Sequence, residues 1–365
     1  MAGGGRQAML VSGDPTRYHV RGAIGVSRLH IGVIGCGSIA RHRHLPEYAG
    51  NPRAEIRAVC DVVQHRAAEM ADAYGARAYT DYAELLRDPD IQAVSVCLPN
   101  DLHAQVTVAA LQAGKHVLCE KPMATSRQEA QEMIEAARRS GKLLMIAHNQ
   151  RFMAAHAKAK QMLHSGRLGA VLTFRTTFSH GGPEGWSIDG AESWFFRKAE
   201  AFVGALGDLG VHKADLVRWL LEDEVASVSA FASTLEKPAD VEDNVVCVLR
   251  MQSGALGTLT ASWTHHPGED NSTHLYCEHG VMHVAADPLY QVIVHYDNGD
   301  TERIEAGQVA TNESQTASGV VDEFVDAIFS GRESAIPGAE GMASLQVILA
   351  ALRSAQTGRA ESIDS

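Results

Sequence analysis

Between residues 29 and 150, short apolar runs alternate with stretches of helix formers, and this alternation constrains the fold more than any other feature of the sequence. The apolar runs read LHIGVIG, EIRAVCD, IQAVSVCLP, KHVLCE and KLLMIAH, with a weaker run, ARAYT, after the second. Because most of them are apolar without a period-two alternation, they indicate strands that are buried on both faces. Strands at this spacing predict a parallel sheet with helices on both sides and right-handed crossovers.

The first apolar run ends in a turn of the form G-x-G-x-x-A, from Gly35 to Ala40. The first glycine permits a tight turn, the second lets backbone N–H groups approach a pyrophosphate, and the alanine lets the following helix pack closely. Because a strand precedes the turn and a helix follows it, we expect a dinucleotide here. The expected cofactor contacts in this turn are Gly35, Gly37, Ser38 and Ile39.

The second apolar run ends at Asp61, about 20 residues beyond the glycine turn. An acidic residue at this position accepts hydrogen bonds from the adenosine ribose hydroxyls and repels a 2′-phosphate. The sequence therefore favours NAD over NADP as the cofactor. Arg66 is the reservation, since a nearby arginine can accommodate the phosphate.

Polar residues follow the later strands, and ligands of such sheets bind at the carboxyl ends of the strands. In the sequence Glu120-Lys121-Pro122, the proline ring keeps Lys121 out of the α region and stiffens the turn. We therefore expect Lys121 to project toward the nicotinamide end of the dinucleotide. The remaining expected cofactor contacts are Pro99, Asn100, His103, Glu120 and Gln150, and the expected substrate contacts at the last strand are Asn149 and Arg151.

After residue 150 the pattern changes to strands with short, turn-like connections. Runs at 169–180, 225–234, 244–251, 254–265, 272–285 and 290–300 predict a mostly antiparallel open sheet of about six strands. One face of this sheet should pack on helices, and a second subunit is the simplest cover for the other, so we expect a homodimer or a homotetramer. The sequence thus divides into a flexible extension at 1–28, a nucleotide-binding domain at 29–150 and a substrate-binding and oligomerisation domain at 151–365.

The stretch between the first two of these strands contains an aromatic loop and the predicted helix 208–221. Asp208 and His212 are four residues apart and share a helical face, and Asp215 follows three residues later. The first two suit a general base with its carboxylate partner, all three would suit a metal site, and a buried polar stripe is the third possibility. Hydride transfer from an alcohol needs only a proton acceptor, so we favour the histidine as base and expect no metal. Trp186 and Trp194 in the loop are candidate contacts for a substrate ring.

The composition excludes other classes of protein. The net charge of −12 argues against a nucleic-acid partner, and no apolar run approaches the roughly 18 residues of a membrane span. The six cysteines form no CxxC pair, which is typical of buried thiols in a reducing cytoplasm. Arg41, His42, Arg43 and His44 are expected to form a solvated first turn after the glycine loop.

Together these residues resemble the glucose–fructose oxidoreductase, inositol dehydrogenase and MocA family. The resemblance rests on GVIGCGSIARHRHLPEY, the pair CD at 60–61, CLPNDLHAQVTVAALQAGKHVLCEKPMA and GDLGVHKADLVRWL, and it extends from residue 29 to the end. It implies an α/β Rossmann domain, an α+β domain with an open sheet that forms dimers or tetramers, and a catalytic set of Lys121, Asp208 and His212. This chain departs from the family at Phe202 and Val203, where glycines are frequent.

This interpretation predicts an NAD-dependent dehydrogenase that oxidises a secondary hydroxyl of a sugar or cyclitol. His212 would accept the hydroxyl proton, Lys121 would hydrogen-bond the same oxygen, and Asp208 would orient the substrate or favour the charged His212. Three alternatives stay open. They are glycoside cleavage with tightly held NAD, a non-catalytic sugar or nucleotide sensor, and a metal-dependent enzyme that uses the same helix.

Overall fold

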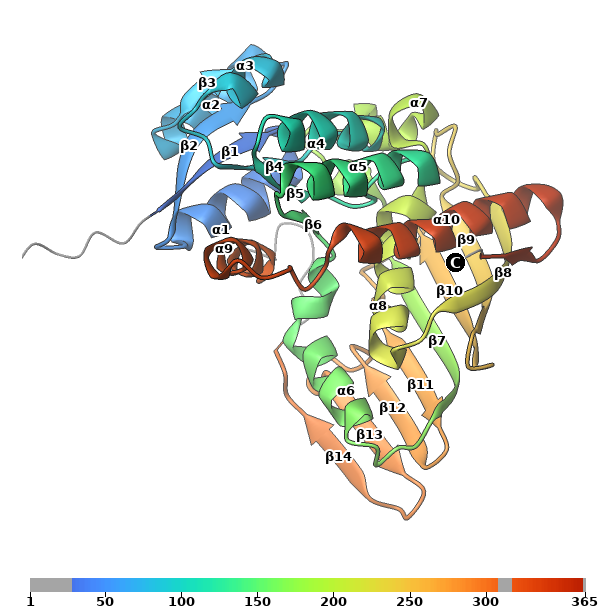
Figure 1. Ribbon diagram of the computed structural model, residues 1–365. Helices are drawn as coiled ribbons and strands as arrows, with labels where there is room; N and C mark the ends of the chain where they lie inside the picture. The colour runs from blue at the N-terminus through green and yellow to red at the C-terminus, as the bar shows by residue number, and fades with distance from the viewer. Residues whose placement is uncertain (1–27, 308–316, 364–365) are drawn as a thin grey trace, which may run out of the picture.

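Two sheets organise the protein in a computed structural model that describes residues 28–307 and 317–363 (Figure 1). The first sheet has the strand order β3-β2-β1-β4-β5-β6, and the second has the order β14-β13-β12-β11-β7-β10-β9-β8-β15. The predicted combination of a Rossmann domain and an open-sheet domain is therefore confirmed. Of the predicted extension at 1–28, all but Arg28 lies outside the described residues.

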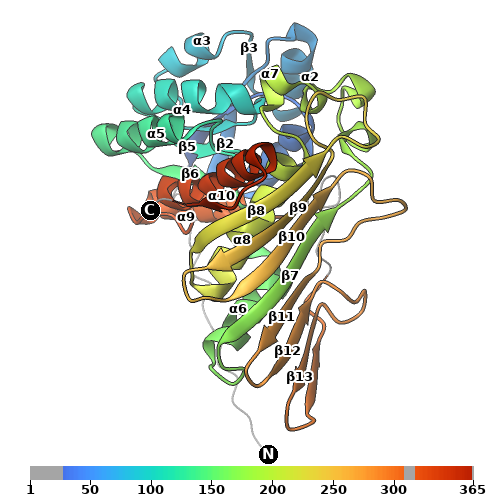
Figure 2. The ribbon, with the colours of Figure 1, turned by 90° about the vertical axis from the view of Figure 1, so that its right-hand side faces the viewer.

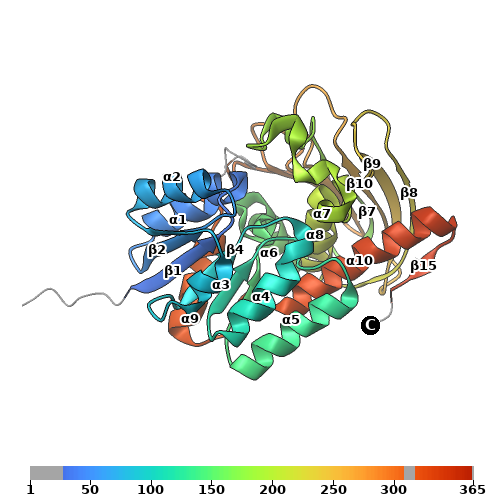
Figure 3. The same cartoon turned by 90° about the horizontal axis from the view of Figure 1, so that it is seen from above.

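All strands of the first sheet pair in parallel, as predicted. The strands are β1 (Leu29–Ile34), β2 (Ala54–Cys60), β3 (Arg77–Tyr79), β4 (Ala93–Val96), β5 (His116–Cys119) and β6 (Leu144–Ile146). The helices between them are α1 (Leu45–Gly50), α2 (Gln64–Tyr74), α3 (Tyr82–Arg87), α4 (His103–Gln112) and α5 (Arg127–Ser140), of which α4 and α5 lie side by side (Figure 3). The strand order reverses between β1 and β4, which opens a crevice at their carboxyl ends.

The segment after the glycine turn differs from its predicted solvated turn. Residues Ala40–His44 form a π-helix that continues into α1, and the prediction was wrong for Arg43 and His44, which are buried. A π-helical turn holds more residues than an α-helical one, which here brings two consecutive polar side chains against the sheet. Arg41 and His42 remain partly exposed.

The second sheet is larger than the predicted six strands. In the described residues it contains β7 (Val171–Ser179), β8 (Val225–Ser233), β9 (Asn244–Met251), β10 (Leu256–Ser262), β11 (Thr273–Cys277), β12 (Gly280–Val284), β13 (Val292–Tyr296), β14 (Thr301–Ile304) and β15 (Glu361–Ser362). The run at 272–285 folds into the hairpin β11–β12, while β14 and β15 are short edge strands. The pair β7–β10 is parallel and the other pairs are antiparallel, so the sheet is mixed but mostly antiparallel.

Helices pack on one face of this sheet, and Figure 2 looks onto the opposite face. The helices of the second half are α6 (Ala154–His164), α7 (Lys198–Ala201), α8 (Val211–Leu221), α9 (Val320–Ser330) and α10 (Gly338–Thr357). Strand β9 shows the reason for the two faces, because Val245, Cys247 and Leu249 are buried while Val246 and Val248 are exposed. Such alternation is typical of a sheet with one buried and one exposed face.

The chain returns to the first domain near its C-terminus. Val321 and Phe324 of α9 belong to the same apolar core as the strands of the first sheet. In α10, Leu345 belongs to that core, whereas Val347 and Ile348 belong to the core of the second domain. Helix α10 therefore packs against both domains, and it contacts α5 and β6 of the first domain and α8 and β8 of the second (Figure 1).

Candidate active site

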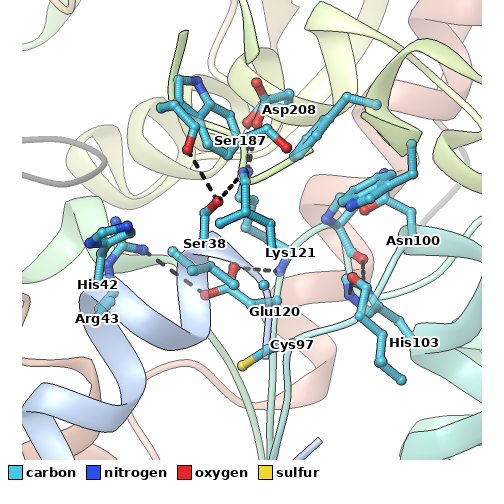
Figure 4. Close-up of a pocket in the computed structure, with 18 of the residues that line it drawn as sticks. Ser38, His42, Arg43, Cys97, Asn100, His103, Glu120, Lys121, Ser187 and Asp208 are labelled. Carbon is cyan, nitrogen blue, oxygen red and sulfur yellow. Dashed lines mark hydrogen bonds and ion pairs between the residues drawn. The ribbon is translucent and has the colours of Figure 1, made fainter. Parts of the chain in front are cut away.

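A cavity with an empty volume of about 1010 Å³ lies where the carboxyl ends of β1, β4 and β5 meet the segment before α8 (Figure 4). The predicted site residues that line it are Gly37, Ser38, Ile39, Asn100, His103, Glu120, Lys121, Trp186, Trp194, Asp208 and His212. The structure thus brings residues from both domains to one cavity.

Lys121 and Asp208 form a buried ion pair on the wall of this cavity. The Lys121 Nζ donates hydrogen bonds to Asp208 Oδ1 at 3.1 Å and to the Asp208 backbone oxygen at 2.8 Å. The other carboxylate oxygen, Oδ2, accepts from Trp263 Nε1 at 3.1 Å. The sequence did not point to Trp263, although its place just after the end of β10 was a weak signal. Both carboxylate oxygens of Asp208 are therefore engaged by fixed donors.

The loop before Asp208 holds its shape through one close backbone contact. Phe202, which stands where the family often has glycine, adopts a φ of 66°, a left-handed value that favours glycine. Gly204 is required sterically, because a Cβ atom there would lie 1.9 Å from the backbone oxygen of Glu242. That oxygen accepts a hydrogen bond from Ala205 N at 2.9 Å. The contact sets where the turn that carries Asp208 (Leu206–Gly210) begins.

His212 lines the cavity from the first turn of α8, and its side chain is buried. Burial, with Lys121 and His148 nearby, lowers the pKa of His212 well below its ordinary value, so the imidazole is neutral near pH 7. The ring of His148 lies edge-on at a centroid distance of 6.4 Å. In the described residues the Nδ1 atom of His212 has no hydrogen-bond partner. In this structure the Asp208 carboxylate bonds to Lys121 and Trp263.

Glu120 forms the floor of the cavity beneath Lys121. Its Oε1 accepts from His44 Nε2 at 2.9 Å, its Oε2 accepts from the Lys121 backbone N–H at 3.2 Å, and Arg43 Nη1 lies 4.0 Å away. Burial by itself raises the pKa of Glu120, but His44, Arg43 and Lys121 outweigh that effect and hold the pKa at about 2. The buried side chains of Arg43 and His44 thus keep a carboxylate ionised next to the lysine.

Two other predicted cofactor residues tie neighbouring loops together. The His103 ring nitrogens lie 2.7 Å from the Pro122 backbone oxygen and 2.8 Å from the Leu98 oxygen. Asn100 Nδ2 donates to the Ala201 oxygen at 2.8 Å. These contacts hold the carboxyl ends of β4 and β5 together and link them to the aromatic segment of the second domain.

Aromatic rings of the second domain also line the cavity. Trp194 and Phe195 stack with centroids 3.9 Å apart, and Trp186 meets Phe195 edge-on at 5.0 Å. The Ser38 hydroxyl of the glycine turn donates to the Trp186 backbone oxygen at 3.1 Å. The aromatic segment therefore contacts the nucleotide-binding turn through Ser38, which Figure 4 labels.

Several predicted residues lie outside the cavity lining. Gly35 shapes the turn, since its φ is 95° and a Cβ atom there would lie 2.1 Å from the Cys97 oxygen. Asp61 accepts from Cys36 N at 2.9 Å and from Val63 N at 2.8 Å, which fixes its carboxylate at the end of β2. Gln150 Nε2 donates to Asn271 Oδ1 at 3.2 Å. Pro99 and Asn149 also lie outside the lining.

Arg151 lies in a buried ion-pair network rather than against the cavity. Its Nε donates to Asp215 Oδ2 at 2.8 Å, and its Nη2 donates to Asp215 Oδ1 and to Glu340 Oε2, both at 2.6 Å. The guanidinium is thus committed to carboxylates, and the structure does not place it against a substrate ring. The Asp215 carboxylate is likewise bound by Arg151. Among residues 28–307 and 317–363, no group of three or more His, Cys, Asp and Glu side chains is arranged so that it could hold a metal ion.

The residues around the glycine turn fit a dinucleotide. A Cβ atom at Gly37 would have no neighbour within 4 Å, so there is open space over the turn, and the Asp61 carboxylate is fixed at the end of the next strand. The cavity continues from that turn to the lysine, carboxylate and histidine described above. A Rossmann fold whose cavity is lined by a lysine, a carboxylate and a histidine is typical of a nucleotide-dependent oxidoreductase.

Comparison with known families agrees with this class. An oxidoreductase family with an NAD-binding Rossmann fold matches residues 29–148, and the GFO/IDH/MocA C-terminal domain matches residues 156–283. The chain belongs to the Gfo/Idh/MocA family of NAD-binding oxidoreductases. It is 32% identical over 280 residues to levoglucosan dehydrogenase of Pseudarthrobacter phenanthrenivorans, which covers 67% of this chain and 70% of that protein.

Other relatives match over nearly the full length. 1,5-Anhydro-D-fructose reductase of Ensifer adhaerens is 30% identical over 345 residues, covering 92% of this chain and 98% of the relative. The solved structure of a levoglucosan dehydrogenase in complex with NADH superposes with a TM-score of 0.83 at 26% identity, covering 93% of this chain and 100% of that one. These relatives are enzymes that act on sugars, and NAD is the cofactor of this chain's family.

Proposed function

We propose that the protein oxidises a secondary hydroxyl of a sugar or cyclitol, with His212 as the general base. The observation that carries this proposal is that Lys121, from the nucleotide-binding domain, and His212, from the second domain, line one cavity with Asp208. Relatives whose names specify levoglucosan, myo-inositol and D-glucoside support the substrate class.

Each residue has a distinct task in this reaction. NAD, when bound, supplies the hydride acceptor. An ammonium has three N–H donors, and Lys121 uses two on Asp208, which leaves one for the substrate oxygen. His212 accepts the hydroxyl proton because its lowered pKa keeps the imidazole neutral. Trp186 and Trp194 offer ring faces against the apolar side of a sugar ring.

The test is NADH formation from NAD across a panel of cyclitols, aldoses, amino sugars and glycosides. We expect turnover with at least one of them, and a loss of kcat by about 100-fold or more in His212→Ala and in Lys121→Ala. His266→Ala is the matched control, because that imidazole is exposed and contacts Glu236 outside the cavity. Full activity in either cavity variant would contradict the assigned roles.

The same panel separates the alternatives. Release of aglycone without net NADH would favour glycoside cleavage, and sugar binding without turnover would favour a sensor. Sensitivity of turnover to a chelator would favour the metal-dependent alternative, which the commitment of Asp208 and Asp215 to other partners argues against.

We further propose that copies of the chain associate through the open face of the large sheet. Exposed apolar side chains on that sheet include Phe231, Val246, Val248 and Leu256. A single copy that exposes such a face is unusual for a soluble enzyme. Val248→Arg should therefore yield monomers in light scattering, whereas Phe329→Arg, on α9 of the other domain, should leave the assembly intact. Monomeric wild-type protein would refute the proposal.

A cytoplasmic location is also proposed. All six cysteines are free thiols and five of them are buried, which suits a reducing compartment. Within the described residues, no helix combines the length and apolar character needed to span a membrane.

A further inference from the structure

The segment from Trp186 to Asp189 crosses from the second domain onto the nucleotide-binding turn. The Ser38 hydroxyl donates to the Trp186 backbone oxygen at 3.1 Å and accepts from the Ile188 backbone N–H at 2.9 Å. Ile188 and Asp189 line the cavity together with Gly37 and Ser38. The second domain therefore contributes a wall to the half of the cavity that receives the nucleotide.

Asp189 ends this segment in an ion pair with Arg66 Nη2. Arg66 lies in the first turn of α2, five residues after Asp61, the acidic residue at the adenosine ribose position. An arginine at such a place accommodates the 2′-phosphate of NADP, because guanidinium groups bind phosphate through paired hydrogen bonds. In this structure the Arg66 guanidinium is already paired with a carboxylate from the other domain, that of Asp189.

Arg41, the second arginine near the turn, is also paired with a carboxylate. Arg41 Nη1 and Nη2 donate to the two carboxylate oxygens of Glu69 at 2.9 and 2.8 Å, and Arg41 Nε donates to the Cys36 oxygen at 2.8 Å. Both arginines beside the ribose position thus have carboxylate partners, but Glu69 belongs to α2 itself, whereas Asp189 comes from the second domain.

We propose that Asp189 is a cofactor-specificity residue that rejects the 2′-phosphate of NADP. It does so because it holds the guanidinium of Arg66, the arginine that follows Asp61 in the first turn of α2. A 2′-phosphate would have to displace the Asp189 carboxylate from Arg66 and would be repelled by that carboxylate, which carries the same charge. This inference needs only the dinucleotide site, and it goes beyond the proposed reaction on a sugar.

The test is fluorescence titration of NADH and NADPH on the purified protein without any sugar. In Asp189→Asn we expect the affinity for NADPH relative to NADH to rise about tenfold, which corresponds to about 1.4 kcal/mol. Adding Arg66→Ala to that variant should remove the gain, because the gain depends on the freed guanidinium. Glu192→Gln is the matched control, since this exposed carboxylate lies three residues after Asp189 and its loss removes one negative charge without removing the partner of Arg66.

An unchanged affinity ratio in Asp189→Asn would overturn the proposal, as would a gain that survives Arg66→Ala or that Glu192→Gln reproduces. Thermal unfolding verifies that each variant is folded, so that a change in the affinity for NADPH relative to NADH is not caused by unfolding. The outcome is independent of the reaction. A shifted cofactor ratio in a protein that oxidises no sugar would refute the proposed function alone, and a sugar dehydrogenase with an unshifted ratio would refute this inference alone.

Discussion

Replacing Lys121 with methionine should destabilise the fold as well as stop the reaction. Methionine keeps an unbranched apolar stem but removes the ammonium from a pair whose side chains are only 13% exposed for Lys121 and 6% for Asp208. Asp208 would then be a buried carboxylate with Trp263 as its remaining side-chain donor. Breaking a buried pair on one side costs about 3–5 kcal/mol, and the partial exposure of the lysine places the expected loss near 3 kcal/mol.

A double-mutant cycle measures how much of this loss is due to the pair. Asp208→Asn removes the negative charge, so the double variant Lys121→Met/Asp208→Asn has no uncompensated buried charge. We expect the double variant to be more stable than the sum of the single losses predicts, by about 2 kcal/mol. Urea unfolding followed by tryptophan fluorescence gives the free energies of unfolding of all four proteins.

An exposed ion pair provides the control. Arg139 and Glu135 lie 3.3 Å apart on α5 with side chains 58% and 43% exposed, so Arg139→Met should cost less than about 0.5 kcal/mol. If the losses in Lys121→Met and Asp208→Asn simply add, the buried pair contributes no coupling and the reasoning from burial is refuted.

Three further predictions concern the loop, the base and the floor of the cavity. Gly204→Ala should lower both stability and kcat, because its Cβ atom would lie 1.9 Å from the Glu242 oxygen, and a variant with wild-type thermal unfolding and kinetics would contradict this. The kcat/KM should stay level as the pH falls through 6.5, since the lowered pKa of His212 keeps the base neutral there, and a decline centred at 6.5 would refute it. The pKa of Glu120 is about 2 in the folded protein against an ordinary 4.5, so the ionised carboxylate stabilises the fold by about 3 kcal/mol above pH 4.5. This stabilisation is lost as the pH falls from 4.5 toward 2. In Glu120→Gln the free energy of unfolding should not show that decline, which acid unfolding of both proteins measures.

The parallel sheet, the glycine turn and the second, open sheet could be predicted from the sequence because each depends on local pattern. Apolar runs and turn residues repeat at the spacing of strands and helices, and Gly35 is needed wherever such a turn passes under a neighbouring strand. Lys121, Asp208 and His212 could be singled out because they occur in short motifs whose place at strand and helix ends limits where their side chains lie.

Partners that are distant in sequence were decided only by the tertiary structure. The spacing of Asp208 and His212 suggested a direct pair, yet Trp263 and Lys121 take the carboxylate, and the contact with Trp263 joins residues 55 positions apart. Arg151 follows β6 at the edge of the predicted crevice, but Asp215 and Glu340 bind it away from the cavity.

The burial of Arg43 and His44 was also decided only by the tertiary structure. Local pattern treats Arg43 and His44 as surface residues because charged side chains usually prefer water, but a π-helical turn and an ionised Glu120 make their burial favourable. The sequence by itself determined the elements and the chemistry available at their ends, since these depend on neighbours along the chain. Which charges meet, and whether a carboxylate faces a lysine, a histidine or an arginine, depends on how two domains pack, and that is settled only in three dimensions.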